Sequence, residues 1–458
     1  MKVVKFGGTS LASAEQIKKV CRIIRDDADR RIVVVSAPGK RDKADTKVTD
    51  LLIRYAERYL DEGAAEHEKS AIFRRFEEIA EGLGLSPDIT EPIMADLHEV
   101  LSARKVESPT RFIDMVKAAG EDTCAKLVAQ YLQSLGEEAQ YVNPYEAGLY
   151  VSDEAGNAQV LPVAYENLHS LRERSGIVVF PGFFGYTPEG MLVTFSRGGS
   201  DITGSILAAA VKAHVYENFT DVDSVYAVNP NLVENPKEIR EITYREMREL
   251  SYSGFSVFHD EALIPAYEAG IPVNIKNTNN PTAPGTMIVA ERKSHKNIVS
   301  GIASDRGFCS LYVSKYLMNR EIGFGRRLLQ ILEEEGLSYE HTPSGIDNIS
   351  VILRETALTV EKEKRIVERV REELAVDDIS VERQLALVMI VGEGMRQSVG
   401  TSARATLALA RAQVNLEMIN QGSSEVSMMF GVKEVDVDRA VLALYDEFFQ
   451  PEPVVSQR

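Results

Sequence analysis

Several short stretches of the chain place charged or hydroxyl side chains beside glycines, where they could bind an anion. In the first, Lys5-Phe6-Gly7-Gly8, a lysine and two glycines end the first apolar run of the chain. Glycine lets backbone N–H groups approach an anion closely, and a nearby helix N-terminus adds positive potential. Residues 13–16 (Ser-Ala-Glu-Gln) begin such a helix with capping-box spacing. These features indicate a phosphate-sized anion site, with the spacing of neither a P-loop nor a dinucleotide fingerprint.

Four further stretches put reactive side chains in turns or at the ends of predicted elements. Glu121 follows a glycine where the pattern predicts the start of a helix, and residues 197–201 place Arg197 and Asp201 around two glycines. Residues 220–221 end a predicted strand, and residues 277–281 form a polar loop. A carboxylate in a first helical turn and a capped turn are both ordinary structure. An arginine directly before two glycines is unusual in a plain turn, so that stretch indicates function most strongly.

The elements that must position these stretches follow an α/β pattern up to about residue 293. Strand-like segments at residues 2–6, 32–35, 177–180 and 215–219, of which 32–35 and 177–180 are uninterrupted apolar runs, alternate with segments of helical periodicity. Such runs are typical of parallel strands that are buried on both faces. Residues 49–104 read as a helical excursion, and residues 272–275 as the last strand. We therefore expect one α/β domain, residues 1–293, with its ligand site at the strand ends.

Past residue 293 the pattern changes to two copies of a βαββαβ repeat. The first copy is predicted at residues 305–383. The second copy, residues 384–458, lacks one strand, which residues 294–304 could supply. We therefore predict that the first small domain is inserted within the second. The exposed sheet edges of such repeats favour pairing with each other or across a homodimer or higher homo-oligomer.

Composition and charge exclude several classes of function. The net charge of −17 argues against binding to nucleic acid or to anionic membranes, because both reward clustered Lys and Arg. The three cysteines lie far apart, so we predict neither a zinc cluster nor a disulfide framework, and no dedicated metal site. No apolar stretch is long enough to span a membrane and no signal peptide is recognisable, which predicts a cytoplasmic protein.

Taken together and in this order, the motifs resemble those of the amino-acid kinase superfamily and, within it, of the aspartokinases. The resemblance covers almost the whole chain. The matching motifs are Lys5-Phe6-Gly7-Gly8-Thr9-Ser10, Gly120-Glu121, Ser196-Arg197-Gly198-Gly199-Ser200-Asp201, Thr220-Asp221-Val222, Asn277-Thr278, Gly285-Thr286, Gly392-Glu393-Gly394-Met395 and Gln421-Gly422-Ser423-Ser424-Glu425. The resemblance implies an amino-acid kinase fold, a mostly parallel sheet sandwiched by helices, followed by two ferredoxin-like ACT domains.

The resemblance also implies an activity, the ATP-dependent phosphorylation of the side-chain carboxylate of L-aspartate to 4-phospho-L-aspartate. This is the first step toward lysine, threonine and methionine. A carboxylate is already ionised and needs no general base, so catalysis would consist mainly of positioning and charge neutralisation. Mg²⁺ would arrive with ATP, held mostly by phosphates and water.

Roles carry over from the family to the matching positions of this chain. Lys5 is expected between the nucleophile and the transferred phosphoryl group, and Asp201 is expected to orient it. Arg197 would hold the α-carboxylate of aspartate and Glu121 its α-ammonium. The remaining substrate-binding residues would be Thr49, Phe183 and Ser200. The nucleotide-binding residues would be Lys5, Gly7, Gly8, Ser10, Thr220, Asp221 and Tyr226.

The sequence departs from the family near the expected nucleotide site. Ser256 and Asn231 stand where family members commonly have a lysine and an arginine, and Asp260 stands where proline is usual. Lys237 or Lys276 could replace the missing positive charge.

Paired ACT domains imply feedback inhibition by lysine, threonine or both, through differential affinity for two quaternary states. The effector would bind where two such domains meet. The candidate residues are Met318, Gly323, Glu340 and Ser344 in the first copy, and Asn415, Ile419 and Gln421 in the second.

Two other hypotheses remain beside an aspartokinase. One is another carboxylate kinase of the same superfamily, acting on glutamate or an acylated glutamate, which the paired ACT domains and the turn at residues 197–201 disfavour. The other is a non-catalytic amino-acid sensor, which the two missing cations would suit. The presence of both Lys5 and Asp201 argues against such a sensor.

Overall fold

A computed structural model describes residues 1–102, 108–196, 198–255, 260–292, 297–422 and 426–450 of the chain. The chain divides into two compact units, which are described separately. The first comprises Met1–Val225, Glu238–Arg248 and Ser256–Arg292. The second comprises Tyr226–Lys237, Glu249–Phe255 and Lys293–Arg458. Two short segments that precede residue 293 thus belong to the second unit.

The first unit is built on an eight-stranded sheet with the strand order β10-β12-β11-β7-β1-β2-β4-β3. Its strands are β1 (Lys2–Phe6), β2 (Arg30–Val35), β3 (Ala139–Tyr141), β4 (Ile177–Pro181), β7 (Val215–Thr220), β10 (Glu241–Thr243), β11 (Val273–Asn277) and β12 (Thr286–Val289). All neighbours pair in parallel except β11 and β12. The predicted α/β fold with a mostly parallel sheet is confirmed. The prediction that β11 is the last strand is wrong, because β12 follows it and pairs beside it.

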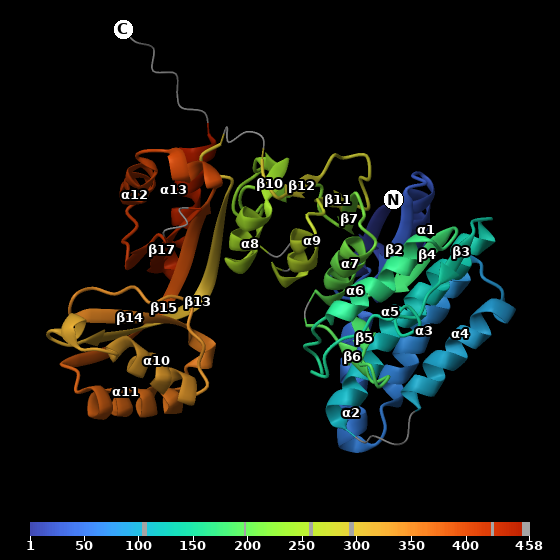
Figure 1. Cartoon of the computed structure of the whole chain (residues 1–458), viewed down its shortest axis with the longest axis horizontal. Coiled ribbons are helices and arrows are strands. Elements are labelled where there is room, and N and C mark those ends of the chain that lie inside the picture. Colours follow the sequence, from blue (N-terminus) through green and yellow to red (C-terminus); the bar gives the residue numbers. More distant parts are fainter. Residues whose placement is uncertain (103–107, 197, 256–259, 293–296, 423–425, 451–458) are drawn as a thin grey trace, which may run out of the picture. The chain divides into compact units, whose positions relative to one another are not determined.

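Helices cover both faces of this sheet. The helices are α1 (Ala14–Arg25), α2 (Val48–Glu62), α3 (Glu66–Leu83), α4 (Pro87–Leu101), α5 (Pro109–Ser134), α6 (Pro162–His169), α7 (Gly199–Ala210), α8 (Tyr244–Tyr252) and α9 (Ile264–Glu268). Figure 1 shows α3, α4 and α5 side by side. One core joins α1 to α5 with alternate strand residues such as Val4 and Phe6. The residues between them, including Lys5, therefore face the opposite side of the sheet, where α7 packs.

The remaining elements connect these layers. The short strands are β5 (Phe184–Tyr186), β6 (Leu192–Thr194), β8 (Val225–Tyr226) and β9 (Glu238–Ile239). A 3-10 turn at Gly8–Leu11 separates β1 from α1, and Ser13 caps α1 by accepting from the N–H of Gln16 at 3.4 Å. The predicted helix start at residue 13 is confirmed, although it lies a turn beyond the glycine pair.

The second unit is built on a five-stranded sheet with the order β14-β13-β15-β17-β16. Its elements are β13 (Gly301–Ser314), α10 (Phe324–Glu334), β14 (Asn348–Arg354), α11 (Val360–Leu374), β15 (Asp378–Val391), α12 (Thr401–Arg411), β16 (Met418–Asn420), β17 (Ser427–Lys433) and α13 (Val437–Phe449). All its paired strands are antiparallel. The helices pack in two pairs, α10 with α11 and α12 with α13 (Figure 1).

Two strands of this unit run through both predicted repeats. β13 and β15 pair along almost their whole length, with irregular register between Arg306 and Ser310. The sequence pattern predicted separate strands at residues 298–303 and 309–313, and again at 378–381 and 385–391. A strand predicted at residues 337–341 is not formed, and only a bridge between His341 and Ile352 remains there.

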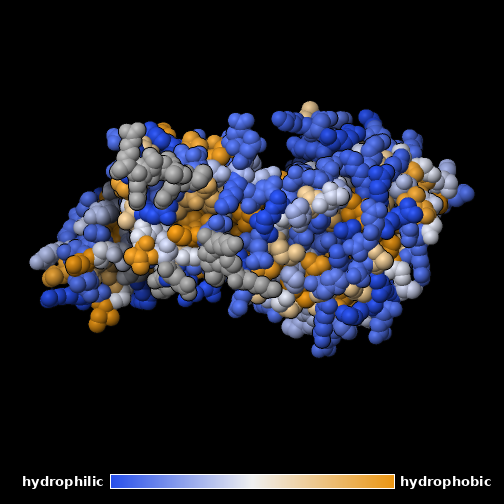
Figure 2. Space-filling view, turned by 90° about the horizontal axis from the view of Figure 1, so that it is seen from above, coloured by the Kyte–Doolittle hydropathy of each residue, from blue (hydrophilic) through white to orange (hydrophobic). Residues whose placement is uncertain are grey.

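The surface is mainly polar. Figure 2 shows that most of the visible face is hydrophilic, with apolar residues in small groups. None of the helices in the described ranges has the length and apolar character needed to cross a membrane.

Candidate active site

A cavity of about 830 Å³ lies at the carboxyl ends of β1, β2, β4 and β7, and we call it the cleft. Parallel sheets of this kind bind ligands at such strand ends, where the order of the strands along the chain reverses. Its lining draws on residues far apart in the sequence. The predicted site residues that line the cleft are Lys5, Gly7, Gly8, Thr49, Glu121, Phe183, Ser200, Asp201, Thr220 and Asp221.

Lys5 is held at the floor of the cleft by a carboxylate. Its Nζ lies 2.5 Å from Oδ1 of Asp201, and only 7% of the residue is exposed. Asn218 lies opposite Lys5 on the neighbouring strand β7, and its amide donates to the same oxygen at 2.6 Å. Asp201 therefore receives two donors from two adjacent strands. This arrangement fixes the lysine ammonium at one point of the cleft.

The glycine turn after β1 supplies backbone donors. The N–H groups of Gly8 and Thr9 meet no hydrogen-bond acceptor in the described part of the chain, as is usual at the start of a helical turn. The N–H of Gly39 donates to the carbonyl of Gly8 at 2.7 Å. A Cβ on Gly39 would lie 2.5 Å from the carbonyl carbon of Gly8, so this close approach requires glycine. The turn can therefore donate to an anion while a second loop holds it in place.

A second set of donors comes from the start of α7. Gly198 precedes this helix with φ 77°, a left-handed conformation that suits glycine, and no side chain caps the helix. Ser200 lies in the first turn and packs so closely on Gly182 that a Cβ there would approach the Ser200 Cβ to 2.7 Å. Arg197, predicted to clamp a carboxylate, lies outside the described residues.

Glu121 is buried on the wall of the cleft, and the prediction that it begins a helix is wrong. α5 continues through it, because Gly120 is needed for packing: a Cβ there would lie 2.9 Å from side-chain atoms of both Ala37 and Leu52. Glu121 is 4% exposed and its Oε2 has no hydrogen-bond partner. Burial raises the pKa of Glu121 to about 8, opposed by the N–H of Ala37 and by the ammonium of Lys117. A buried carboxyl with a free oxygen is prepared to receive a cation.

Phe183 has strained backbone beside the cleft. Its φ is 80°, which is uncommon outside glycine, and its N–H donates to Oγ1 of Thr203 at 3.0 Å. The ring packs on Gly199, where a Cβ would lie 2.6 Å away. Packing on α7 therefore fixes the aromatic wall of the cleft.

The nucleotide-binding residues predicted from sequence divide into those in the cleft and those outside it. The hydroxyl of Thr220 donates to Oδ1 of Asp221 at 3.1 Å at the end of β7. Ser10 does not line the cleft; its hydroxyl is buried against Oγ1 of Thr278 at 2.7 Å and ties the turn to the 277–281 loop. Tyr226 begins a segment of the second unit.

The positions that depart from the family pattern add no cation to the cleft lining. Ser256 and the side chain of Asp260 lie outside the described residues. Asn231 and Lys237 belong to the second unit, where Lys237 donates to Asn297 at 3.4 Å. The ammonium of Lys276 donates to the carbonyl of Ala283 at 2.9 Å.

Sequence reasoning missed several residues of the lining, among them Lys47 and Lys117. Lys117 lies four residues before Glu121, on the same face of α5, and this spacing was the available signal. No group of three or more His, Cys, Asp or Glu side chains with metal-binding arrangement occurs among the residues that the structure describes.

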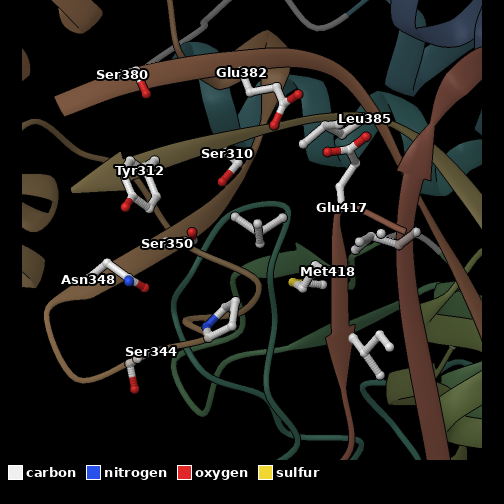
Figure 3. Close-up of a pocket in the computed structure, with 16 residues that line it drawn as sticks. Ser310, Tyr312, Ser344, Asn348, Ser350, Ser380, Glu382, Leu385, Glu417 and Met418 are labelled. Carbon is white, nitrogen blue, oxygen red and sulfur yellow. The ribbon is translucent and has the colours of Figure 1, made fainter. Parts of the chain in front are cut away.

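The second unit has a hollow of its own, about 460 Å³ in volume, on one face of its sheet (Figure 3). It is lined by the hydroxyl-bearing residues Ser310, Tyr312, Ser350 and Ser380. Two acidic residues, Glu382 and Glu417, also line it and lie near Leu385. Of the predicted effector residues, Ser344 and Ile419 belong to this lining.

The other predicted effector residues lie elsewhere in the second unit. Gly323 caps α10 with φ 78°, and Met318 is buried nearby in the core of the first repeat. Glu340 pairs with Arg354 at 3.4 Å, and the amide of Asn415 donates to Glu417 at 2.9 Å. Gln421 is exposed.

The chain matches known proteins over almost its whole length. Residues 1–277 match the model of the amino acid kinase family, and residues 388–448 match that of an ACT domain. Aspartokinase 3 of Bacillus subtilis (strain 168) is 61% identical over 449 residues, covering 98% of this chain and 99% of the relative. The crystal structure of Clostridium acetobutylicum aspartate kinase is 37% identical, with a TM-score of 0.86 over 98% of this chain and 100% of that one.

A more distant structural relative is Escherichia coli aspartokinase III. Its complex with aspartate and ADP, termed the R-state, is 25% identical and has a TM-score of 0.77. Its complex with lysine and aspartate, termed the T-state, is 26% identical with the same TM-score. Both comparisons cover 98% of this chain and 100% of the other.

Proposed function

Because the chain belongs to the amino acid kinase family and, within it, to the aspartokinases, we propose that its cleft binds L-aspartate beside the terminal phosphate of ATP. An aspartokinase transfers that phosphoryl group to the side-chain carboxylate of aspartate. The attacking carboxylate is already charged, so the enzyme must bring two anions together and neutralise the charge of the transferred group. The proposal rests on one observation above all, the convergence of Lys5, Glu121 and the two glycine turns on one cleft.

Lys5 performs the charge neutralisation. Its ammonium lies 2.5 Å from Oδ1 of Asp201, and the amide of Asn218 donates to the same oxygen at 2.6 Å, which holds the carboxylate in place. From that position the ammonium contacts both the attacking carboxylate and the phosphoryl oxygens. A preorganised cation does not have to move as charge develops, which is why such groups accelerate transfer strongly.

The nucleotide phosphates bind to the backbone donors. The N–H groups of Gly8 and Thr9 and the first turn of α7 at Ser200 face this part of the cleft. Thr220 and Asp221 border the nucleotide at the end of β7. Mg²⁺ bound with ATP would supply further charge neutralisation. Asp221 is a cleft carboxylate that could hold it beside phosphate and water ligands, since the described residues offer no group of three or more metal-binding side chains.

The amino-acid head binds on the opposite wall. Glu121 offers its free oxygen to the α-ammonium, Phe183 and Thr49 shape the pocket, and Arg197, by its motif, holds the α-carboxylate. Glu121 must be ionised to bind an ammonium. In the free enzyme, however, burial keeps this carboxyl largely protonated up to a pKa of about 8.

This protonation predicts the pH dependence of aspartate use. We expect kcat/KM for aspartate to rise from about pH 6 to about pH 9, with a midpoint near the free-enzyme pKa of about 8, because raising the pH ionises Glu121. The Glu121→Gln variant should lose this rise and resemble the wild type only at the acid end. Initial rates at low aspartate concentration, measured across this pH range, give kcat/KM for the wild type and for the variant. A variant that keeps the rise would remove Glu121 from the ammonium site.

The second unit regulates the enzyme through its ACT domain. We infer that lysine, alone or with threonine, is the inhibitor, bound among residues of the first repeat near the open N-terminus of α10 at Gly323, with contributions from the second repeat. A lysine complex of the Escherichia coli relative supports this inference. The exposed edges of the sheet in this unit make a homodimer or higher homo-oligomer the expected assembly, in the cytoplasm.

One assay tests the proposal against its alternatives. Purified protein is incubated with MgATP, hydroxylamine and either L-aspartate or L-glutamate, and the hydroxamate is measured. We expect product with aspartate only, and a decrease of the rate as lysine and threonine are titrated singly and together. A product with glutamate would support another carboxylate kinase. No product with either amino acid would support a non-catalytic sensor.

A further inference from the structure

Lys117 is a cation in the lining of the cleft that no sequence motif singles out. It lies on α5, and its side chain is 14% exposed. Its ammonium lies 3.1 Å from Oδ1 of Asp114 and 5.3 Å from the centre of the Phe183 ring. An aromatic face attracts a cation and keeps it from moving freely. Lys117 is therefore placed against the same aromatic wall that shapes the amino-acid pocket.

Asp114 does not saturate this cation. Its two oxygens also accept from the N–H of Gly156 at 2.9 Å, the N–H of Thr194 at 2.9 Å and the hydroxyl of Thr194 at 2.8 Å. The carboxylate thus ties the turn at Gly156 and the end of β6 to α5 whether or not the lysine is present. An ammonium has three donors, and Asp114 uses one of them. In the described ranges the other two have no acceptor.

Lys117 and Glu121, whose carboxyl is negative once it is ionised, lie on one helix face. Side chains four residues apart on a helix are neighbours, with about 5–6 Å between Cβ atoms. Such a pair would ordinarily form an ion pair, yet Lys117 bonds to Asp114 and Oε2 of Glu121 is left without a partner. The free oxygen and the free donors therefore both remain available to a ligand that carries both charges close together.

We propose that Lys117 is a specificity-determining residue that binds the α-carboxylate of aspartate while Glu121 binds the α-ammonium. The proposal rests on the assignment of the cleft as the aspartate site. The zwitterionic head of an amino acid carries its two charges on one carbon, which fits two opposite charges one helical turn apart. A carboxylate has room for about four donors, so Lys117 and Arg197 can share it.

The test compares lysine variants with two substrates. Lys117→Met keeps an unbranched side chain of similar length but removes the charge. Lys126→Met is the matched control, because Lys126 lies on the same helix, pairs with Asp96 and Asp122, and is not part of the cleft lining. The substrates are L-aspartate and its α-amide, which keeps the ammonium and the side-chain carboxylate but has an uncharged amide in place of the α-carboxylate. Initial rates give KM and kcat for each combination.

We expect Lys117→Met to raise KM for aspartate about tenfold, with kcat within about twofold, because one charged hydrogen bond to the substrate is lost. KM for the α-amide should change by less than about twofold, and Lys117→Arg should recover part of the loss with aspartate. Lys126→Met should match the wild type. Thermal unfolding of both methionine variants checks that the fold is retained.

Two outcomes would overturn the role of Lys117. In one, Lys117→Met raises KM for both substrates equally, as expected if the lysine only supports the segments that Asp114 ties to α5. In the other, KM for aspartate stays within about twofold of the wild type. If the wild-type enzyme itself did not distinguish aspartate from its α-amide, the placement of the amino-acid head in the cleft would fail as well.

Discussion

Lys5→Met is expected to lower kcat by about 10³-fold or more, while KM for aspartate and for ATP changes far less. The ammonium of Lys5 is fixed at the floor of the cleft by Asp201, whose carboxylate also accepts from the amide of Asn218. Its removal leaves the approach of a carboxylate to a phosphate without local charge neutralisation. Because the charge of the transferred group develops in the transition state, the loss falls on kcat. The hydroxamate assay at saturating substrates measures it.

Lys2→Met is the matched control on the same strand. Lys2 lies at the other end of β1, where it pairs with Asp27 at 2.8 Å and Glu217 at 3.3 Å. Its loss should lower thermal stability and leave kcat within about twofold. If Lys5→Met retained turnover within about tenfold of the wild type while remaining folded, Lys5 would not be the group that neutralises the transferred phosphoryl charge.

Part of the cleft lining was predictable, because those residues lie at or just after strand ends. Parallel strands bring their carboxyl ends to one edge of the sheet. Gly8 after β1 and Thr220 at the end of β7 therefore both line the cleft, although they lie far apart in the sequence. Period-2 alternation also places Lys5 on the face opposite Phe6. Local pattern and topology are sufficient for this part of the site.

The environment of Glu121 could not be predicted from its neighbours. A glycine before a glutamate indicates a helix start, but Gly120 serves close packing in the middle of α5. Whether a glycine marks a helix boundary or allows close packing inside a helix depends on which residues pack against it, and local sequence does not contain that information. The same limit explains Ser10, whose partner Thr278 lies at the opposite end of the first unit's sequence.

In the second unit the repeat pattern was visible and the strand lengths were not. β13 and β15 each continue past the positions where the hydrophobic periodicity changes. Their mutual pairing resumes on both sides of the irregular register at Gly307 and Phe308, so each remains one strand. Residues 337–341, which carry a strand-like pattern, make a single bridge instead. Strand pairing depends on the partner strand, so local pattern locates extended segments but not which of them join into one strand or fail to form one.

Asp201→Asn is expected to lower kcat by about 10²-fold through its effect on Lys5. Asparagine keeps the shape and can still contact Asn218, but it cannot offer the charged acceptor that fixes the lysine ammonium. The lysine then samples other positions, and only a fraction of bound complexes has the cation in place. KM for aspartate should change little, because the residues proposed to hold the amino-acid head are Glu121, Arg197 and Lys117. Saturation kinetics with each substrate measures this division.

A double variant separates this role from a purely structural one. An acidic residue in the first turn of α7 also stabilises the helix by about 0.3–1 kcal/mol, and losing that contribution would affect folding and not turnover. If Asp201 acts through Lys5, then Lys5→Met with Asp201→Asn should be no slower than Lys5→Met alone, since the carboxylate has nothing left to position. If the two losses multiply instead, Asp201 acts on the substrates directly. If the fall in kcat were explained by a fall in thermal stability, Asp201 would have only a structural role. The non-additive outcome is expected because Asp201 Oδ1 contacts Lys5 directly at 2.5 Å.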